Sequence, residues 1–530
     1  MDLNRLPLVK SRVAVVPAVA PFLAVLVGLI GQLTYGRAVV WTGDSFGFVH
    51  AGMMLAAGQD PAAHLEGRSL GYTLVTALAL PLGGLRALVT IQSVAAAASL
   101  VAVLGLLRGL LRGRWVFCGV GLATVLMAYA CDSFVVYAQT LNADSLFGSA
   151  LTVSFVLLCA TLQRRGEAAI VAMTAAFAFA YASYLLKPNA LFVIPIYGLA
   201  LVWTLWRGRW SVLKFGSFVS LAVLLAIICV SQAYQSKWKN PEINFGAGVL
   251  YAAHMDLINR DLDLSKPAQR DLHAIVDEVL QGPKWAILGL NADHCYYDAR
   301  CQAAIRAAAG ADNLKPGPWM MRRFLMAVVR HPFAYSHKVL KQSFYFLRHS
   351  NEVVDLVYPS AISDEEWDQI LPYDHLVRFH RDELDRQVGS WVAERARFIS
   401  FAGKHMVGLM RRTLPLTLLI SLAAAGLGWR HRRLNVVQTA FLAAATVVLA
   451  CVLSVAASMT FDIPRYAASF AVLTMLWWTL GWLWSTHWLI EQGLVRLETC
   501  TNGFDLHVRW PQSVSSSLLG VGRSRHGQVE

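Results

Sequence analysis

The run "VAVVPAVAPFLAVLVGLIGQL", residues 13–33, decides the fold, because it has no charged residue and is long enough to cross a bilayer as a helix. Its apolar length exceeds that of a signal-peptide core and no clear small-residue cleavage site follows, so we interpret it as an uncleaved anchor. Of the 530 residues, 56% are hydrophobic and 15% are charged, whereas soluble domains have roughly 25% charged residues. The chain is therefore predicted to be an all-α polytopic membrane protein.

Comparable apolar runs recur along the chain and predict about ten transmembrane helices. The further runs are residues 87–107, 115–130, 146–162, 168–186, 190–206, 215–234, 414–429, 436–459 and 467–490. The stretch "LGYTLVTALALPLGG", residues 70–84, is apolar but short. We interpret it as a juxtamembrane or re-entrant helix on the outer side, because counting it as a span would place the following basic cluster outside.

The basic residues fix the predicted orientation. The net charge of +13 could indicate nucleic-acid binding, but the basic residues gather in alternate loops, which is the pattern of cytoplasmic loops in membrane proteins. Both termini are then cytoplasmic. The clusters are Arg5, Lys10 and Arg12; Arg108, Arg112 and Arg114; Arg164 and Arg165; Arg207, Arg209 and Lys214; and Arg430, Arg432 and Arg433.

Four regions follow from this topology: a transmembrane half (1–234) with an outer loop (34–86), a helical outer domain (235–412), closing transmembrane helices (413–490) and a cytoplasmic tail (491–530). We expect the tail to be disordered. The basic, aromatic-rich stretch "WMMRRFLMAVVRHPFAYSHKVLKQSFYFLR", residues 319–348, is broken by Pro332. It fits either a helix on a membrane surface or a helix packed on its neighbours.

Two cysteines of the outer domain, Cys295 and Cys301 in "HCYYDARC", favour a disulfide if the domain lies in an oxidising compartment. Metal ligation together with His294 or Asp298 is the alternative, but no second ligand pair stands nearby at zinc-site spacing.

No P-loop, dinucleotide-binding glycine pattern or zincin helix occurs, which argues against an ATP-driven transporter. Instead, polar residues stand at the predicted outer helix ends: Asp44, Asp144, Lys187 and Arg465. Taken singly, each has an ordinary explanation. Asp44 fits a helix N-cap or loop acid, Asp144 fits the first turn of a helix, and the two cations fit snorkelling to headgroups. Taken together, they suggest a site at headgroup level, because a charge at the bilayer centre costs roughly 2.5 to 3.5 kcal/mol.

Four stretches carry a family resemblance: "GDSFGFVHAGMMLAAGQDP", "EGRSLGYTLVTALALPL", "YAQTLNADSLFGSAL" and "YLLKPNALFVIPI", with a weaker echo at "IPRYA". In this order the set resembles the GT-C integral-membrane glycosyltransferases, such as the protein mannosyltransferases and the aminoarabinose transferase of lipid A. The resemblance implies a GT-C-like fold and a polyprenyl-phosphate sugar as donor. It also implies a periplasmic site in a bacterial inner (plasma) membrane.

By this resemblance Asp44 is the catalytic base, and Asp144 takes the place of a second acid that is commonly glutamate. Lys187 stands where the family usually has an arginine before proline, and residues 68–73 match its "R-S-P-G-Y-P" stretch without either proline. The predicted substrate-binding residues are Arg68, Tyr72, Tyr137, Lys187 and Arg465. Of these, Lys187 and Arg465 would hold the phosphate as charge-assisted donors, with Arg68 a further candidate.

The chemistry suits such a site, because a lipid phosphate leaves without an acid catalyst. One base to deprotonate an acceptor hydroxyl and cations to hold the phosphate would suffice, and direct attack would invert the anomeric centre.

Sequence alone leaves several alternatives open. The acceptor could be a glycolipid such as lipid A, a glycan or a protein. A divalent cation could be shared by Asp44 and Asp144, although hard cations usually take more oxygen ligands. A flippase or transporter for a lipid-linked sugar and a non-catalytic scaffold for envelope assembly are the rival functions. Few charges stand inside the spans, which argues against the transporter.

Overall fold

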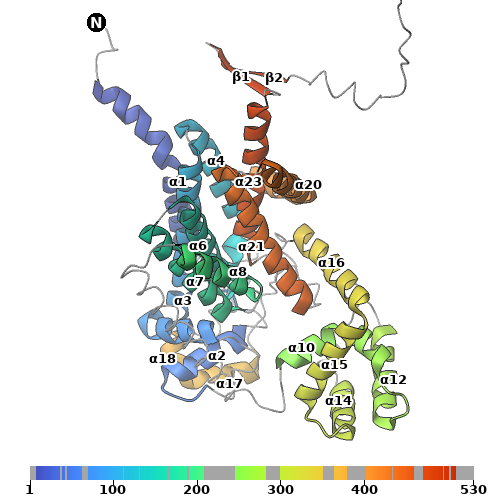
Figure 1. Cartoon of the computed structure of the whole chain (residues 1–530). Helices are drawn as coiled ribbons and strands as arrows, with labels where there is room; N and C mark the ends of the chain where they lie inside the picture. Colours follow the sequence, from blue (N-terminus) through green and yellow to red (C-terminus); the bar gives the residue numbers. More distant parts are fainter. Residues whose placement is uncertain are drawn as a thin grey trace, which may run out of the picture.

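The computed structural model describes residues 7–35, 39–41, 45–61, 70–111, 113–130, 132–164, 166–187, 190–207, 245–281, 299–349, 363–378, 401–431, 434–458, 469–492, 495–500 and 503–508 (Figure 1). These residues are helical apart from one isolated β-bridge, a short hairpin and connecting turns. The predicted helical fold class is confirmed at this level.

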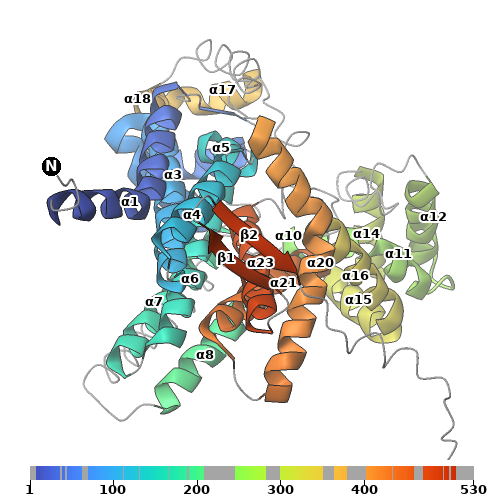
Figure 2. The same ribbon diagram turned by 90° about the horizontal axis from the view of Figure 1, so that it is seen from above.

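The first half of the chain forms a bundle of helices. It contains α1 (Pro7–Tyr35), α2 (Ser45–Ala56), α3 (Leu70–Leu110), α4 (Arg114–Ala130), α5 (Asp132–Gln139), α6 (Asp144–Gln163), α7 (Glu167–Leu186) and α8 (Val193–Arg207). The closing group is α20 (Phe401–His431), α21 (Val436–Ser458) and α23 (Ala471–Glu491). In the view along the bundle, this closing group lies between the first half and the helices α10–α16 (Figure 2).

Six helical stretches are long and apolar enough to cross a membrane. They are residues 16–34, 70–110, 144–163, 167–186, 405–430 and 436–457. Of the remaining predicted spans, α4 and α8 are apolar but shorter, and α23 occupies most of 467–490 without being one of the six. The predicted span 215–234 lies outside the described residues. The total of about ten therefore stays a prediction.

The insertion between the two groups consists of short helices. They are α10 (Phe245–Ala253), α11 (Met255–Ile258), the 3₁₀ turn η4 (Asn259–Asp261), α12 (Pro267–Gln281), α14 (Ala299–Ala311), α15 (Pro316–Arg330), α16 (Pro332–His349), α17 (Asp364–Ile370), η5 (Leu371–Tyr373) and α18 (Asp374–Val377). In α12, Leu272, Val276 and Val279 recur at helical spacing and are buried in a core separate from that of the bundle. In Figure 1 these helices lie at the opposite end from the start of α1 and from the hairpin.

The predicted end of the short apolar stretch 70–84 corresponds to a break inside α3. Gly83 and Gly84 depart from helical backbone angles, and Gly84 has φ +66°, which favours glycine. A β-carbon on Gly84 would overlap the carbonyl oxygen of Val377 at the end of α18. Arg378 also donates to the carbonyl of Pro81 at 3.2 Å. The apolar stretch 70–84 is thus a separate segment, and α18 packs on its end.

One sequence-based expectation needs correction. The tail after residue 491 was expected to be disordered, but β1 (Val495–Cys500) and β2 (Gly503–Val508) form an antiparallel hairpin with Val495 opposite Val508. Residue 412, the predicted boundary of the outer domain, lies inside α20.

We expect the replacement Gly84→Ala to destabilise the protein by about 1 to 2 kcal/mol from backbone strain alone, with further loss from the clash with Val377. Thermal unfolding of the purified protein in detergent measures this effect. Gly105→Ala is the matched control, because Gly105 lies in the same helix and has open space around it. Equal unfolding midpoints for the two variants would contradict the role given to Gly84.

Candidate functional site

Two segments far apart in sequence pair at the end of the bundle that faces the insertion. The amide of Val40 donates to the carbonyl of Gln139 at 3.0 Å, and the amide of Leu141 donates to the carbonyl of Val40 at 3.1 Å. This isolated parallel bridge places residues 39–41 beside residues 139–141. The first segment ends three residues before Asp44, and the second ends three residues before Asp144.

An ion pair lies next to this bridge. The ammonium of Lys187 donates to the carboxylate of Asp144, and the two side chains are 8% and 2% exposed. Asp144 is the first residue of α6 and Lys187 directly follows the last residue of α7, and α6 and α7 pack side by side. A carboxylate at a helix N-terminus and a cation at a helix C-terminus are each stabilised by the helix dipole. The geometry therefore favours both charges where they stand.

Backbone and side-chain contacts fix the loop before Asp144. Asn142 accepts the backbone N–H of Asp144 through its side chain at 3.1 Å. Gln92, in the middle of α3, donates to the carbonyls of Thr140 at 2.8 Å and Ala138 at 3.2 Å. Tyr72 in turn donates its hydroxyl to Gln92 at 2.8 Å. Tyr72 is thus linked to the acid-bearing loop through one amide side chain.

A small pocket opens beside Asp144, between α3, α5, α6 and α23. Its polar lining includes the side chains of Ser99, Ser145 and Ser149. The chain just before α23 approaches α6 closely here, since a β-carbon on Gly148 would overlap the carbonyl oxygen of Ser469. Ser469 stands four residues after Arg465 in sequence.

The structure describes some of the predicted site residues and not others. Asp44, Arg68 and Arg465 lie outside the described residues. Tyr137 belongs to α5, but its side chain is not described. Tyr72, Asp144 and Lys187 are described and lie at one end of the bundle.

These contacts bear on the ordinary explanations that the sequence offered for Lys187 and Asp144. Lys187 does not snorkel toward headgroups, because it is 7% exposed and paired with Asp144. Asp144 does occupy the first turn of a helix, as expected. The roles of Gln92 and Asn142 were not predicted. The signal for Gln92 was an amide inside the apolar run 87–107, which must find partners when buried.

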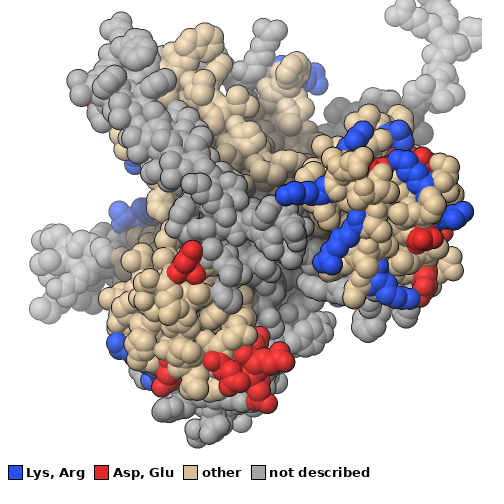
Figure 3. Space-filling view, turned by 90° about the horizontal axis from the view of Figure 1, so that it is seen from below, with Lys and Arg blue, Asp and Glu red and all other residues tan. Residues whose placement is uncertain are grey.

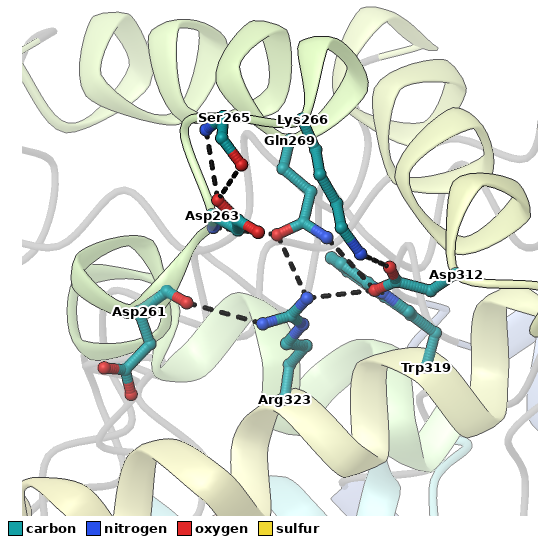
Figure 4. Close-up of polar contacts among 8 residues, drawn as sticks. All are labelled: Asp261, Asp263, Ser265, Lys266, Gln269, Asp312, Trp319 and Arg323. Carbon is teal, nitrogen blue, oxygen red and sulfur yellow. Dashed lines mark hydrogen bonds and ion pairs between the residues drawn. The ribbon is translucent and has the colours of Figure 1, made fainter.

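A second polar cluster, in the insertion, is structural (Figure 4). The carboxylate of Asp312 accepts from Lys266, from Gln269 at 3.1 Å, from Trp319 at 2.9 Å and from Arg323 at 2.9 Å. The Lys266 bond, with further help from the Trp319 and Arg323 bonds, lowers the pKa of Asp312 to about 2. Because this carboxylate is satisfied by four side chains of the domain itself, we interpret the cluster as the tie between α12, α14 and α15.

The structure describes one of the two cysteines that were predicted to form a disulfide. Cys301 is disulfide-bonded and buried at the start of α14. Cys295, His294 and Asp298 lie outside the described residues. Among the described residues, no group of three or more acidic, histidine or cysteine side chains is placed to hold a metal ion.

Comparison of the chain with known protein families, with curated proteins and with solved structures found no match.

We expect Asp144→Asn and Lys187→Met each to destabilise the protein by about 3 to 5 kcal/mol, because each leaves a buried charge without its partner. The double variant should lose clearly less than the sum of the two, since it removes both charges. Thermal unfolding in detergent measures all three. Glu278→Gln is the control, because its pair with Arg300 is exposed and should contribute little. Additive losses in the double variant would refute the pairing.

The insertion should lose stability on acidification because of His254. Its ring lies 5.0 Å from that of Phe324 and 5.3 Å from that of Tyr335, and Nδ1 lies 3.0 Å from the Leu250 carbonyl. Burial, followed by the nearby Lys338 ammonium, lowers the pKa of His254 to about 3. The unfolded histidine titrates near 6.5, so the unfolded chain binds one more proton as the pH falls below about 6.5. Stability should then fall by up to about 1.4 kcal/mol per pH unit until the pH approaches the folded pKa.

Hydrogen exchange of the full-length protein, corrected for intrinsic rates, tests this effect. Peptides from residues 245–281 should lose protection between about pH 7 and pH 5, whereas peptides from α6 and α7 should not. His254→Phe keeps an aromatic ring but has no titrating group, so its protection should depend less on pH. The same pH dependence in this variant and in the wild type would exclude His254 as the cause.

Proposed function

We propose that the chain is a membrane glycosyltransferase that transfers a sugar from a polyprenyl-phosphate donor to an envelope acceptor. The observation that supports this most directly is the Val40–Thr140 bridge beside the Asp144–Lys187 pair. The bridge places residues 39–41, which precede Asp44 in the sequence, beside residues 139–141, which precede Asp144. Among the described residues, Tyr72, Asp144 and Lys187 come from three of the four stretches that carry the resemblance and lie at one end of the bundle, as a shared site requires.

The reaction needs one base. In this proposal the Asp44 carboxylate takes the proton of an acceptor hydroxyl as its oxygen attacks the anomeric carbon. The bond from that carbon to the phosphate oxygen breaks, and the electron pair leaves with the lipid phosphate. The configuration at the anomeric carbon is inverted. No acid is required at the leaving group, because the phosphate carries the charge as an anion.

Cations must hold that developing anion, and Arg68, Lys187 and Arg465 are the candidates. The pairing of Lys187 with Asp144 changes the role proposed for the second acid. Asp144 is better suited to position Lys187 and to stabilise its charge than to accept a proton itself. We therefore treat Asp144 as a positioning residue and Asp44 as the catalytic base. Tyr72 is linked to the same loop through the side chain of Gln92 and would help to hold that loop in place.

The site is proposed to face the periplasm from a bacterial inner membrane. The insertion lies at the end of the bundle opposite the start of α1 (Figure 1). A disulfide at Cys301 suits an insertion on the oxidising side. In α6, α7 and α21 the charged residues stand only at helix ends or are lacking, which does not favour a polar path for a transporter. The proposal requires no metal.

The test is a mass-spectrometric profile of envelope glycolipids and glycans from cells that carry wild type, a deletion or Asp44→Asn. We expect the deletion and Asp44→Asn to share the loss of one sugar-sized mass, with turnover reduced by about 10² to 10⁴ in the variant. Asp60→Asn is the matched control, because Asp60 is an exposed acid of the same loop. Its profile should equal that of the wild type.

Membrane levels of each protein must be measured in parallel, so that a lost product is not mistaken for a lost protein. A mass that disappears in the deletion and returns fully with Asp44→Asn would reject the transferase mechanism. That outcome would favour a transporter or a scaffold.

A further inference from the structure

Helix α16 has two opposite faces with different surroundings. At 100° per residue, Tyr335, Val339, Gln342 and Phe346 fall on one side of the helix. Val339 and Phe346 are buried in the core of the transmembrane bundle, with Tyr335 packed against it. Tyr335 also donates its hydroxyl to the carbonyl of Ala457 at 3.3 Å, at the end of α21. One face of α16 is therefore fixed to a candidate membrane span at the end of the bundle.

The opposite face is apolar but exposed. Phe333, Leu340 and Phe344 are 88%, 55% and 57% exposed, and they recur on one side of the helix. An ordinary surface helix of a soluble domain turns polar side chains outward, with an apolar stripe on one face only. Since α16 is packed on one face and apolar on the other, its outer face is unsuited to water. An apolar surface beside a transmembrane span is suited to lipid.

The charges beside this face are positive. No aspartate or glutamate stands between Pro316 and His349 in the sequence. Lys341 and His337 are exposed at the edge of the apolar face, and Arg322 is exposed on α15. Figure 3 shows lysine and arginine over much of the lobe formed by α10–α16, with some acidic residues among them, and a separate acidic group over α17. Positive charge beside exposed aromatic residues is the pattern of helices that bind an anionic lipid surface.

We propose that the outer face of α16 (Phe333, His337, Leu340, Lys341 and Phe344) lies in the headgroup region of the same membrane that holds the bundle, with anionic phospholipid headgroups beside Lys341. The proposal does not depend on the enzymatic function. It rests on the observation that one face of α16 packs into the transmembrane core while the opposite face is apolar and exposed. Docking of this face would fix the height of the insertion above the bilayer, because Lys338 of α16 bonds to Asp256 and to the Ala253 carbonyl.

Photo-crosslinking in intact membranes tests the contact. Benzoylphenylalanine is placed in the full-length protein at position 333, 340 or 344, and at position 264 as the control. Leu264 is a 49% exposed residue of the same lobe and precedes α12, away from α16. We expect phospholipid adducts at the three α16 positions and only background at position 264. Adducts to a second copy or to another protein at the α16 positions, or equal lipid adducts at all four, would overturn the proposal.

The charge preference is tested in nanodiscs that contain both anionic and zwitterionic phospholipid. The ratio of anionic to zwitterionic adducts at position 344 should exceed the ratio in the nanodisc. Lys341→Gln should lower that excess by up to about fivefold, which corresponds to roughly 1 kcal/mol for one cation at an anionic surface. Lys315→Gln, an exposed lysine at the start of α15, should leave it unchanged. An adduct ratio equal to that of the bulk lipid in the wild type would refute the anionic preference.

Discussion

The buried ion pair between Asp144 and Lys187 is the constraint on which the rest of this site depends. It joins the start of α6 to the end of α7, so these two helix ends must lie at the same level. A buried pair of this kind contributes little net stability, because desolvation offsets the attraction. Its effect is on specificity, since any arrangement that separates the two leaves a charge buried alone. The loop before Asp144 is held by Asn142 and Gln92, and the segment before Asp44 pairs with that loop in turn.

The insertion is attached to the bundle at two places by different means. Through α16, apolar residues join the bundle core, and a tyrosine bonds to the end of α21. Through α18, a carbonyl packs against a glycine that has no side chain to prevent it. Tyr373, the last residue of η5, adds a hydrogen bond to Gln59 and a ring contact to His50, so the turn before α18 is also joined to the region of α2. The insertion is thus held on both sides of the bundle end on which the proposed site lies.

The sequence predicted these elements to different extents. The long apolar runs predicted the six candidate spans, and the short apolar run predicted a separate segment at 70–84, because the length of an apolar run is a local property. The partnership of Asp144 with Lys187 could not be predicted, since each residue fitted its own helix end equally well without the other. Gln92 was hidden within an apolar run, and its partners lie 46 and 48 residues away. The hairpin at 495–508 was missed because the prediction rested on the composition of the whole tail.

The Val40–Thr140 bridge also has a consequence for the order of assembly. Its two segments are one hundred residues apart and share a pair of backbone hydrogen bonds, and closing that loop costs more entropy than these two bonds return. The helices between them must therefore be in the membrane and packed before the bridge becomes stable. During synthesis, the chain emerges from its N-terminal end, and Lys187 follows both segments. The end of the bundle that carries the Asp144–Lys187 pair is then completed late, after the helices that support it.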